Sequence, residues 1–271
     1  MKRYRVSNFY INTEGNLLRN LPQGLGPDDV NYQSFVERYG KRDFDQKLQR
    51  YLSIENPVLS VVQDHIPLLE EINNSYVAGN FYSCLTAACC LGERIFNDVF
   101  FAINGDHKSS DWYRKYWNKG VIQNWPDGIS MLHEWKVIDE ETRKKYLLLY
   151  KLRTYSVHFQ KSEQDFEKMS FEAIEIINCI VRRIFGMNEY RKDILIHFEV
   201  PGEIFIRKGA ELLPIVKAFY IPASHKLGYM YKVESTANPG QYQITDDNEY
   251  ESKEITDEEF VVLRNNFVSN P

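Results

Sequence analysis

The sequence lacks every feature that would place it in a membrane or mark it for export. No stretch approaches the roughly 20 consecutive apolar residues that a membrane-spanning helix needs. The basic N-terminus, MKRYRVSNFYINTEG, is followed by no apolar stretch of signal-peptide length. We therefore expect a cytoplasmic protein that makes no membrane contact.

Cysteine is scarce, and its spacing is not that of a metal site. The four cysteines, Cys84, Cys89, Cys90 and Cys179, lie in apolar segments with helical periodicity and form no CxxC pair. Their pattern indicates reduced core residues and neither a disulfide framework nor a zinc site. The chain also has no glycine-rich phosphate loop, HExxH or GxSxG motif. We therefore expect no metal and no cofactor.

Composition indicates a folded globular protein, with 271 residues, of which 43% are apolar and 26% charged. The net charge of −5 counts against a nucleic-acid binder held by long-range electrostatics. The charge is unevenly distributed, however. Between Asp111 and Lys161, ten basic residues face six acidic ones, whereas from Thr245 to Glu259 eight acidic residues face Lys253 alone. Both runs can equally be solvated faces.

The hydrophobic pattern divides the chain into three predicted segments: residues 1–52 as an N-terminal arm, 53–188 as a helical bundle and 189–271 as a β-rich C-terminal region. In the arm we expect a short strand within Tyr4–Ile11, followed by loops. The predicted fold class is mainly α, and α+β overall.

Five helices are predicted in the central segment. The first follows Pro57 and extends for about five turns to Ile72. The second, Gly79–Ile103, is apolar nearly all round, which is typical of a central helix, so its charged Glu93 and Arg94 stand out. Three more are expected at Gly128–Trp135, from the N-cap Asp139 onward, and at Ser162–Phe185, with an irregular connection from Asp111 to Trp125. Short links between four or five helices predict an antiparallel bundle.

In the C-terminal region, apolar and polar residues alternate between turn signals. This pattern predicts short strands in Ile194–Val200, Glu203–Arg207, Leu227–Glu234 and Gln241–Thr245. A last helix is expected at Thr256–Asn265, because Thr256 and Glu259 have the spacing of a capping box.

The segment LYKLRTYSVHF places Arg153 and His158 five positions apart at the end of the fourth predicted helix. This arrangement resembles the HEPN superfamily, whose helical bundles carry an R-x4-6-H motif. The resemblance covers about 57–185, nearly half of the chain. One position departs from the family pattern, because Thr154 stands where active members often have Asn, Asp or His.

The resemblance implies a metal-independent endoribonuclease that acts as a toxin or antiphage-defence effector, with two motifs facing each other in a homodimer. RNA supplies its own nucleophile, the 2′-hydroxyl, so the protein needs a group that moves a proton near neutral pH and a cation for the phosphorane. Histidine and arginine suit these tasks. The expected products carry a 2′,3′-cyclic phosphate. The catalytic candidates are Arg153 and His158, and the supporting candidates are Glu93 (which would orient Arg153), Thr154, Tyr155 and Ser156.

Helix geometry constrains this pair. Five residues on an ideal helix put Arg153 and His158 about 140° apart around the axis and about 7.5 Å apart along it. Either the helix unwinds near Ser156 or a second copy completes the site, and we expect both.

Other interpretations remain open. Arg153 can instead form an intramolecular salt bridge without a catalytic role, and His158 can be a half-buried histidine that ends a helix. The chain would then be a non-catalytic HEPN scaffold for dimerisation or RNA binding. A bundle with an apolar groove for a small ligand is a further alternative. The acidic C-terminal region is the candidate for sensing, for docking an antitoxin or other regulatory partner, or for covering a basic cleft.

Overall fold

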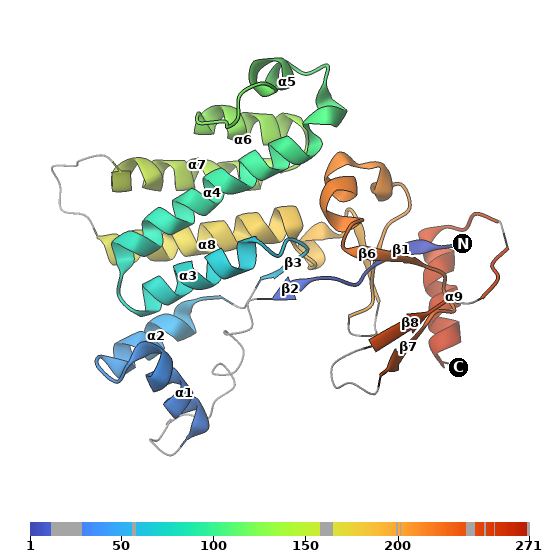
Figure 1. Cartoon of the computed structure of the whole chain (residues 1–271), viewed down its shortest axis with the longest axis horizontal. Coiled ribbons are helices and arrows are strands. Elements are labelled where there is room, and N and C mark those ends of the chain that lie inside the picture. The colour runs from blue at the N-terminus through green and yellow to red at the C-terminus, as the bar shows by residue number, and fades with distance from the viewer. Residues whose placement is uncertain are drawn as a thin grey trace. The chain divides into compact units, whose positions relative to one another are not determined.

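The computed structural model describes residues 1–11, 29–55, 58–157, 165–198, 200, 202–236, 242–246, 248–251 and 253–269. The described chain is mainly helical with small antiparallel sheets (Figure 1). It forms two compact units. The helical unit is Tyr10–Gly186, and the mixed unit combines Met1–Phe9 with Met187–Pro271.

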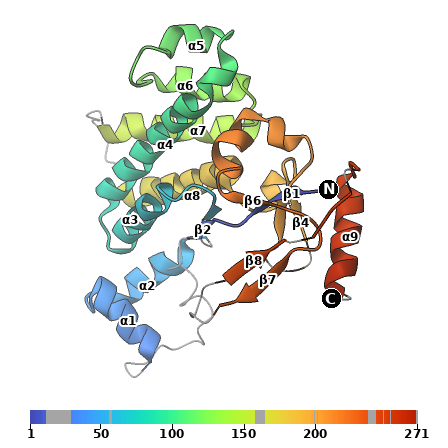
Figure 2. The same ribbon diagram turned by 45° about the vertical axis from the view of Figure 1, so that its right-hand side comes forward.

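Four long helices pack side by side in the helical unit (Figures 1 and 2). They are α3 (His65–Val77), α4 (Phe81–Ile103), α7 (Glu140–Val157) and α8 (Phe166–Phe185). Helix α4 contacts the other three, which explains why its sequence is apolar nearly all round. The prediction of a central helix over this segment is confirmed.

The ends of these helices follow from local chemistry. Asp139 accepts a 2.8 Å hydrogen bond from the backbone N–H of Thr142, which satisfies one free donor at the start of α7, as predicted. Asp165 does the same for α8 through the N–H of Lys168, at 3.0 Å. Helix α8 ends at Gly186, where a Cβ would lie 2.1 Å from the carbonyl oxygen of Arg182. Only glycine fits at that position without a backbone shift.

Gly92 lets α4 and α7 approach closely. A Cβ at this position would lie 2.6 Å from Cδ2 of Leu149 on α7 and 3.1 Å from the Trp125 ring. Both neighbours are buried, so neither can swing into solvent.

A Gly92→Val substitution is therefore expected to lower the free energy of unfolding by about 2–3 kcal/mol, because overpacking outweighs the gain in helix propensity. Chemical denaturation followed by tryptophan emission measures this, since all four tryptophans lie in the helical unit. Gly105→Val serves as a control, because nothing lies within 4 Å of a Cβ there. Equal effects at the two positions would contradict the packing argument.

Three predictions for the helical unit are wrong, and a fourth has the right helix with a late start. The first helix does not begin near Pro57: Leu59–Ser60 forms strand β3, which pairs with β2 (Tyr10–Ile11), and the helix starts at His65. The expected loops of the N-terminal arm include α1 (Val30–Tyr39) and α2 (Phe44–Ser53). The connection expected to be irregular contains α5 (Asp111–Tyr116), and the helix predicted at Gly128 begins earlier, as α6 (Trp125–Glu134).

The mixed unit contains a four-stranded antiparallel sheet in the order β4-β5-β1-β6. These strands are β4 (Leu195–His197), β5 (Ile204–Ile206), β1 (Arg3–Val6) and β6 (Ser224–Leu227), and a separate hairpin pairs β7 (Lys232–Ser235) with β8 (Tyr242–Thr245). The predicted β-rich texture is thus present. One predicted strand, Leu227–Glu234, is in fact the end of β6 and the start of β7.

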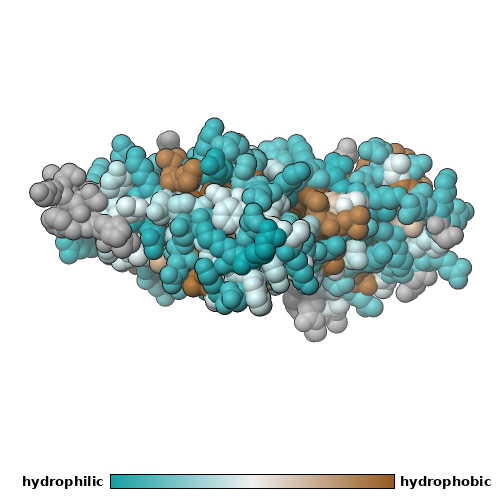
Figure 3. Space-filling view, turned by 90° about the horizontal axis from the view of Figure 1, so that it is seen from above, coloured by the Kyte–Doolittle hydropathy of each residue, from teal (hydrophilic) through white to brown (hydrophobic). Residues whose placement is uncertain are grey.

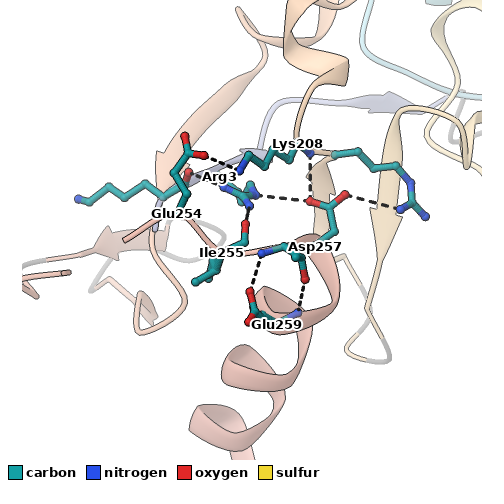
Figure 4. Close-up of polar contacts among 9 residues, drawn as sticks. Arg3, Lys208, Glu254, Ile255, Asp257 and Glu259 are labelled. Carbon is teal, nitrogen blue, oxygen red and sulfur yellow. Dashed lines mark hydrogen bonds and ion pairs between the residues drawn. The ribbon is translucent and has the colours of Figure 1, made fainter. Parts of the chain in front are cut away.

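Helix α9 (Asp257–Ser269) completes the mixed unit. Its capping box is confirmed: Thr256 N–H donates to Glu259 Oε2 at 2.8 Å, and Glu259 N–H donates to Thr256 Oγ1 at 3.2 Å. Arg3 of β1 donates to the carbonyl of Ile255 at 2.6 Å and lies 3.5 Å from Asp257 (Figure 4). The start of α9 is thereby tied to the N-terminal strand.

A buried ion pair holds the middle of α9. Arg264 donates to both carboxylate oxygens of Glu203, at 3.1 and 2.5 Å, and to the carbonyls of Tyr229 and Tyr231. Its guanidinium also lies 3.7 Å from the centre of the Tyr231 ring. The Arg264 and Glu203 side chains are only 6% and 8% exposed, so the charge of each is compensated mainly by the other and not by water.

The two units differ from the three predicted segments. The division after Gly186 lies close to the predicted boundary at 188/189. The predicted arm, 1–52, is not one piece: β1 pairs within the mixed unit, whereas α1 and α2 belong to the helical unit. Strand pairing across almost the whole chain accounts for this, since the partners of β1 lie beyond residue 200.

The cysteines are free, but they do not share one environment. Burial raises the pKa of the Cys84 and Cys89 thiols to about 12, so both stay protonated and unreactive at neutral pH. Cys90 is exposed and Cys179 half-buried. The prediction of four core cysteines is therefore wrong for Cys90, which faces outward from α4.

Hydrophobic residues on the face seen in Figure 3 form small patches separated by hydrophilic ones. Within the described ranges, every helix is too short or too polar to cross a membrane.

Candidate functional site

Arg153 lies in the last turns of α7, on the border between the buried and solvent-facing sides of that helix. Its neighbours Leu149 and Leu152 are buried, while its own side chain remains 33% exposed. A guanidinium in this position keeps its charge and can reach an anion from solvent.

Two side chains from other helices hold this guanidinium. Glu93 of α4 lies 3.6 Å from it, atom Oε2 to atom Nη2, so the contact expected between these residues is present. Trp125 of α6 donates its ring N–H to the same carboxylate oxygen at 2.8 Å. The Arg153 guanidinium also lies 5.6 Å from the centre of the Trp125 ring, within range of a cation–π interaction.

Trp125 is a site residue that sequence reasoning missed. It is 1% exposed, it packs edge-on against Phe96 and it stacks on Tyr150 one turn before Arg153. Its ring nitrogen therefore has a fixed position, and so does the Glu93 oxygen that it bonds. The only sequence signal was a tryptophan between the N-cap Asn124 and a proline.

Asn97, one turn after Glu93, is a second missed residue. Its side-chain oxygen accepts the backbone N–H of Ile122 at 2.7 Å, and its amide donates to the Ile122 carbonyl at 3.3 Å. These two bonds fix the connection that leads into Trp125. Asn97 is thus a positioning residue, because it acts through the segment that carries Trp125.

A pocket of about 540 Å³ lies beside Glu93, between α3 and α4. Its walls are largely apolar, with Leu68 and Ile72 from α3, Leu91 from α4 and Val121 from the connection to α6. Glu71 and Glu93 provide carboxylates at its edge. The Glu93 carboxylate thus faces both this pocket and Arg153.

The other supporting candidates are mostly engaged with the helix itself. Thr154 donates its hydroxyl to the carbonyl of Tyr150, and Ser156 donates to the carbonyl of Arg153, both at 3.0 Å. Ser156 is also buried. Tyr155 is 38% exposed, and the Lys151 ammonium lies 5.9 Å from the centre of its ring. Of these three side chains, only that of Tyr155 has an aromatic ring, partly exposed to solvent, on which a base could stack.

His158 lies outside the described residues. Helix α7 continues through Ser156 and ends at Val157, and the residues that follow are outside the described part of the chain. The expected unwinding near Ser156 therefore stays a prediction. The predicted meeting of Arg153 and His158 stays a prediction.

Four of the five other histidines, His65, His107, His133 and His197, contact nearby groups. Buried His65 lies 3.2 Å from Asp98, His133 lies 3.4 Å from Glu140, and His197 faces the carbonyl of Met187 at 3.1 Å. Burial lowers the pKa of His107, which stacks on Trp135. In the described ranges, no group of three or more His, Cys, Asp or Glu side chains could hold a metal ion.

The locally basic stretch is partly neutralised by its own carboxylates. Lys115 pairs with Asp127 at 2.6 Å, and Arg143 pairs with Glu140 at 3.1 Å. These pairs are exposed, and exposed pairs contribute little free energy, so a phosphate could replace either carboxylate at small cost. The arrangement at Arg153 is more fixed, because Trp125 holds Glu93 in place.

The chain was compared with protein-family models, with curated proteins and with solved structures, and nothing matched in any of the three.

Proposed function

We propose that this chain is a metal-independent endoribonuclease of the HEPN type, which cleaves RNA through attack of the 2′-hydroxyl on the adjacent phosphate. The observation that carries the proposal is the partly exposed Arg153 guanidinium, which is paired with Glu93 and lies within cation–π range of the Trp125 ring. A fixed arginine with free donors suits the developing charge of a phosphorane. His158, five positions further along the chain, is the general base or acid in this mechanism.

The proposal extends to the setting of the enzyme. Unrestrained cleavage of cellular RNA harms the cell that makes the enzyme, so the chain is proposed to be, like the HEPN proteins that it resembles, a cytoplasmic toxin or antiphage-defence effector with an antitoxin or regulatory partner. A homodimer would bring two motifs together, which the site would need if an ideal helix extended to His158, because five residues on such a helix put two side chains about 140° apart.

The test is cleavage of mixed RNA in the presence of EDTA by the wild-type chain and by His158→Ala. We expect products that end in a 2′,3′-cyclic phosphate, and a loss of at least about 100-fold in rate for the variant. His133→Ala is the matched control, because this histidine is also in the helical unit and its side chain is 43% exposed. No cleavage by the wild type, or full activity in His158→Ala, would refute the enzymatic assignment.

A second candidate function is a non-catalytic HEPN scaffold for dimerisation or RNA binding. The observation that favours it is the engagement of the site's own groups: Glu93 offsets the charge of Arg153, and the hydroxyls of Thr154 and Ser156 are bonded to the α7 backbone. Such a protein would bind RNA and leave it intact in the same assay.

A further inference from the structure

The acidic run near the C-terminus has no part in the proposed ribonuclease, and four of its eight carboxylates have partners inside the mixed unit. The paired ones are Asp246 with Lys2, Glu254 with Lys208, Asp257 with Arg3 and Arg207, and Glu259 with the backbone N–H of Thr256. Figure 4 shows the contacts of Glu254, Asp257 and Glu259. Glu249 and Glu251 differ, because neither has a hydrogen-bond or ion-pair partner among the described residues. These two charges stabilise nothing that is visible in the described fold.

Glu249 and Glu251 stand at the rim of an open groove of about 710 Å³ in the mixed unit. Tyr229, Ile255 and Leu263 line it, and all three pack in or against the hydrophobic core of this unit. Val262 of α9 also lines the groove and is 57% exposed. The groove therefore has an apolar lining that packs against the core of the unit, and one of its aliphatic side chains, Val262, remains largely exposed to solvent.

The charge around this apolar lining has one dominant sign. Four carboxylates line the groove, from Glu249, Glu251, Glu258 and Glu259, against two ammonium groups, those of Lys253 and of the N-terminal residue Met1. Carboxylates on both the 249–251 loop and the first turn of α9 border the apolar residues. An occupant that complements both features needs an apolar side chain and several positive charges along its length.

We propose that this groove binds a basic, amphipathic polypeptide segment of a partner protein. An apolar side chain of the segment lies against Val262 and Leu263, and flanking lysine or arginine side chains meet Glu249 and Glu251. The spread of carboxylates along the groove favours a polypeptide over a small organic cation, because a single ammonium group can meet only part of the rim. The proposal is independent of the ribonuclease assignment.

The test is fluorescence anisotropy of a fluorescein-labelled peptide of leucine and lysine, with the leucines on one face, titrated with the full chain. We expect saturable binding that is weakened about threefold to tenfold by Glu249→Gln/Glu251→Gln, since exposed ion pairs contribute up to about 1 kcal/mol each. Val262→Asp is expected to weaken binding by about tenfold, because it places a charge against the apolar face of the peptide.

The matched control is Glu211→Gln/Glu234→Gln, which changes the net charge equally at positions outside the groove. A scrambled peptide of the same composition, a peptide with glutamate in place of lysine, and spermine as a competitor complete the design. Each of four results would overturn the proposal. These are no binding of the peptide, equal weakening by the control pair, equal binding of the scrambled peptide, and displacement of the peptide by spermine at the concentration at which the peptide itself saturates. Circular dichroism checks that Val262→Asp is folded. If Val262→Asp is not folded, the comparison of Glu249→Gln/Glu251→Gln with the control pair still tests the proposal.

Discussion

An Arg153→Lys variant is expected to cleave RNA about 100 to 1,000 times more slowly than the wild type, while unfolding at nearly the same denaturant concentration. Lysine keeps the positive charge beside Glu93, so the ion pair and the fold persist. It loses the planar fork of donors, which can bind two phosphate oxygens at once. The rate is measured on a defined RNA under single-turnover conditions, together with a denaturation curve.

Arg143→Lys is the matched control for this variant. It makes the same substitution on the same helix, at an exposed arginine that pairs with Glu140. We expect it to cleave at the wild-type rate. If both variants are equally slow, the loss of rate follows from replacing an arginine of α7 by lysine and is not specific to position 153. If Arg153→Lys is fully active, Arg153 does not contact the reacting phosphate. A scaffold without activity would show no cleavage in any of the three chains.

Arg264→Met is expected to destabilise the mixed unit by about 3–5 kcal/mol, the usual cost of removing one partner of a buried ion pair. Glu203 would keep a buried charge, and the carbonyls of Tyr229 and Tyr231 would lose their donor. Tryptophan emission reports only the helical unit, so the measurement is amide hydrogen exchange in α9, with α4 as the internal reference. Faster exchange in α9 is the expected result, and unchanged exchange would contradict it.

The double variant Glu203→Leu/Arg264→Met separates the two contributions. With no carboxylate left unpaired, it should be more stable than Arg264→Met alone. If the double variant is the less stable of the two, the unpaired Glu203 charge is not what makes the single variant costly.

The same pair predicts a dependence on pH. Burial acts to raise the pKa of Glu203, but the hydrogen bonds and positive charge of Arg264 outweigh it, so the pKa lies below its ordinary value of 4.5. As the pH falls, the Glu203 carboxylate therefore takes up its proton at a higher pH in the unfolded chain than in the folded protein. The contribution of the pair to stability is complete above about 4.5 and is lost as the pH falls through the lower pKa of the folded protein.

Those parts of the fold that depend on neighbours in sequence could be predicted. Helix α4 is long and apolar enough for its period to be unambiguous, and the capping box of Thr256 and Glu259 needs only three residues of spacing. Helices α1 and α2 were missed although their apolar and aromatic residues have helical spacing, at Tyr32, Phe35, Val36 and Tyr39 and at Phe44, Leu48, Tyr51 and Leu52. Each helix has only 10 residues, and an apolar pattern over so short a run is weak evidence for a helix.

Features set by partners far away in the sequence could not be predicted. Val58, Val61 and Val62 continue the helical spacing of α3, yet Val61 donates its backbone N–H to the carbonyl of Phe185, and the preceding residues pair with β2. The candidate site shows the same limit. Glu93 and Arg153 could be proposed from a motif, but the bond that fixes Glu93 comes from Trp125, on a helix with no visible link to it in the sequence.

The central place of β1 between β5 and β6 has a consequence for synthesis. The ribosome makes this strand before the helical unit, but its hydrogen-bond partners emerge only after the entire helical unit has been translated. The helical unit can fold while β1 waits unpaired, and the mixed unit closes last. A fragment that begins at Met187 would therefore lack an inner strand of its own sheet, and supplying residues 1–9 as a separate peptide should restore it.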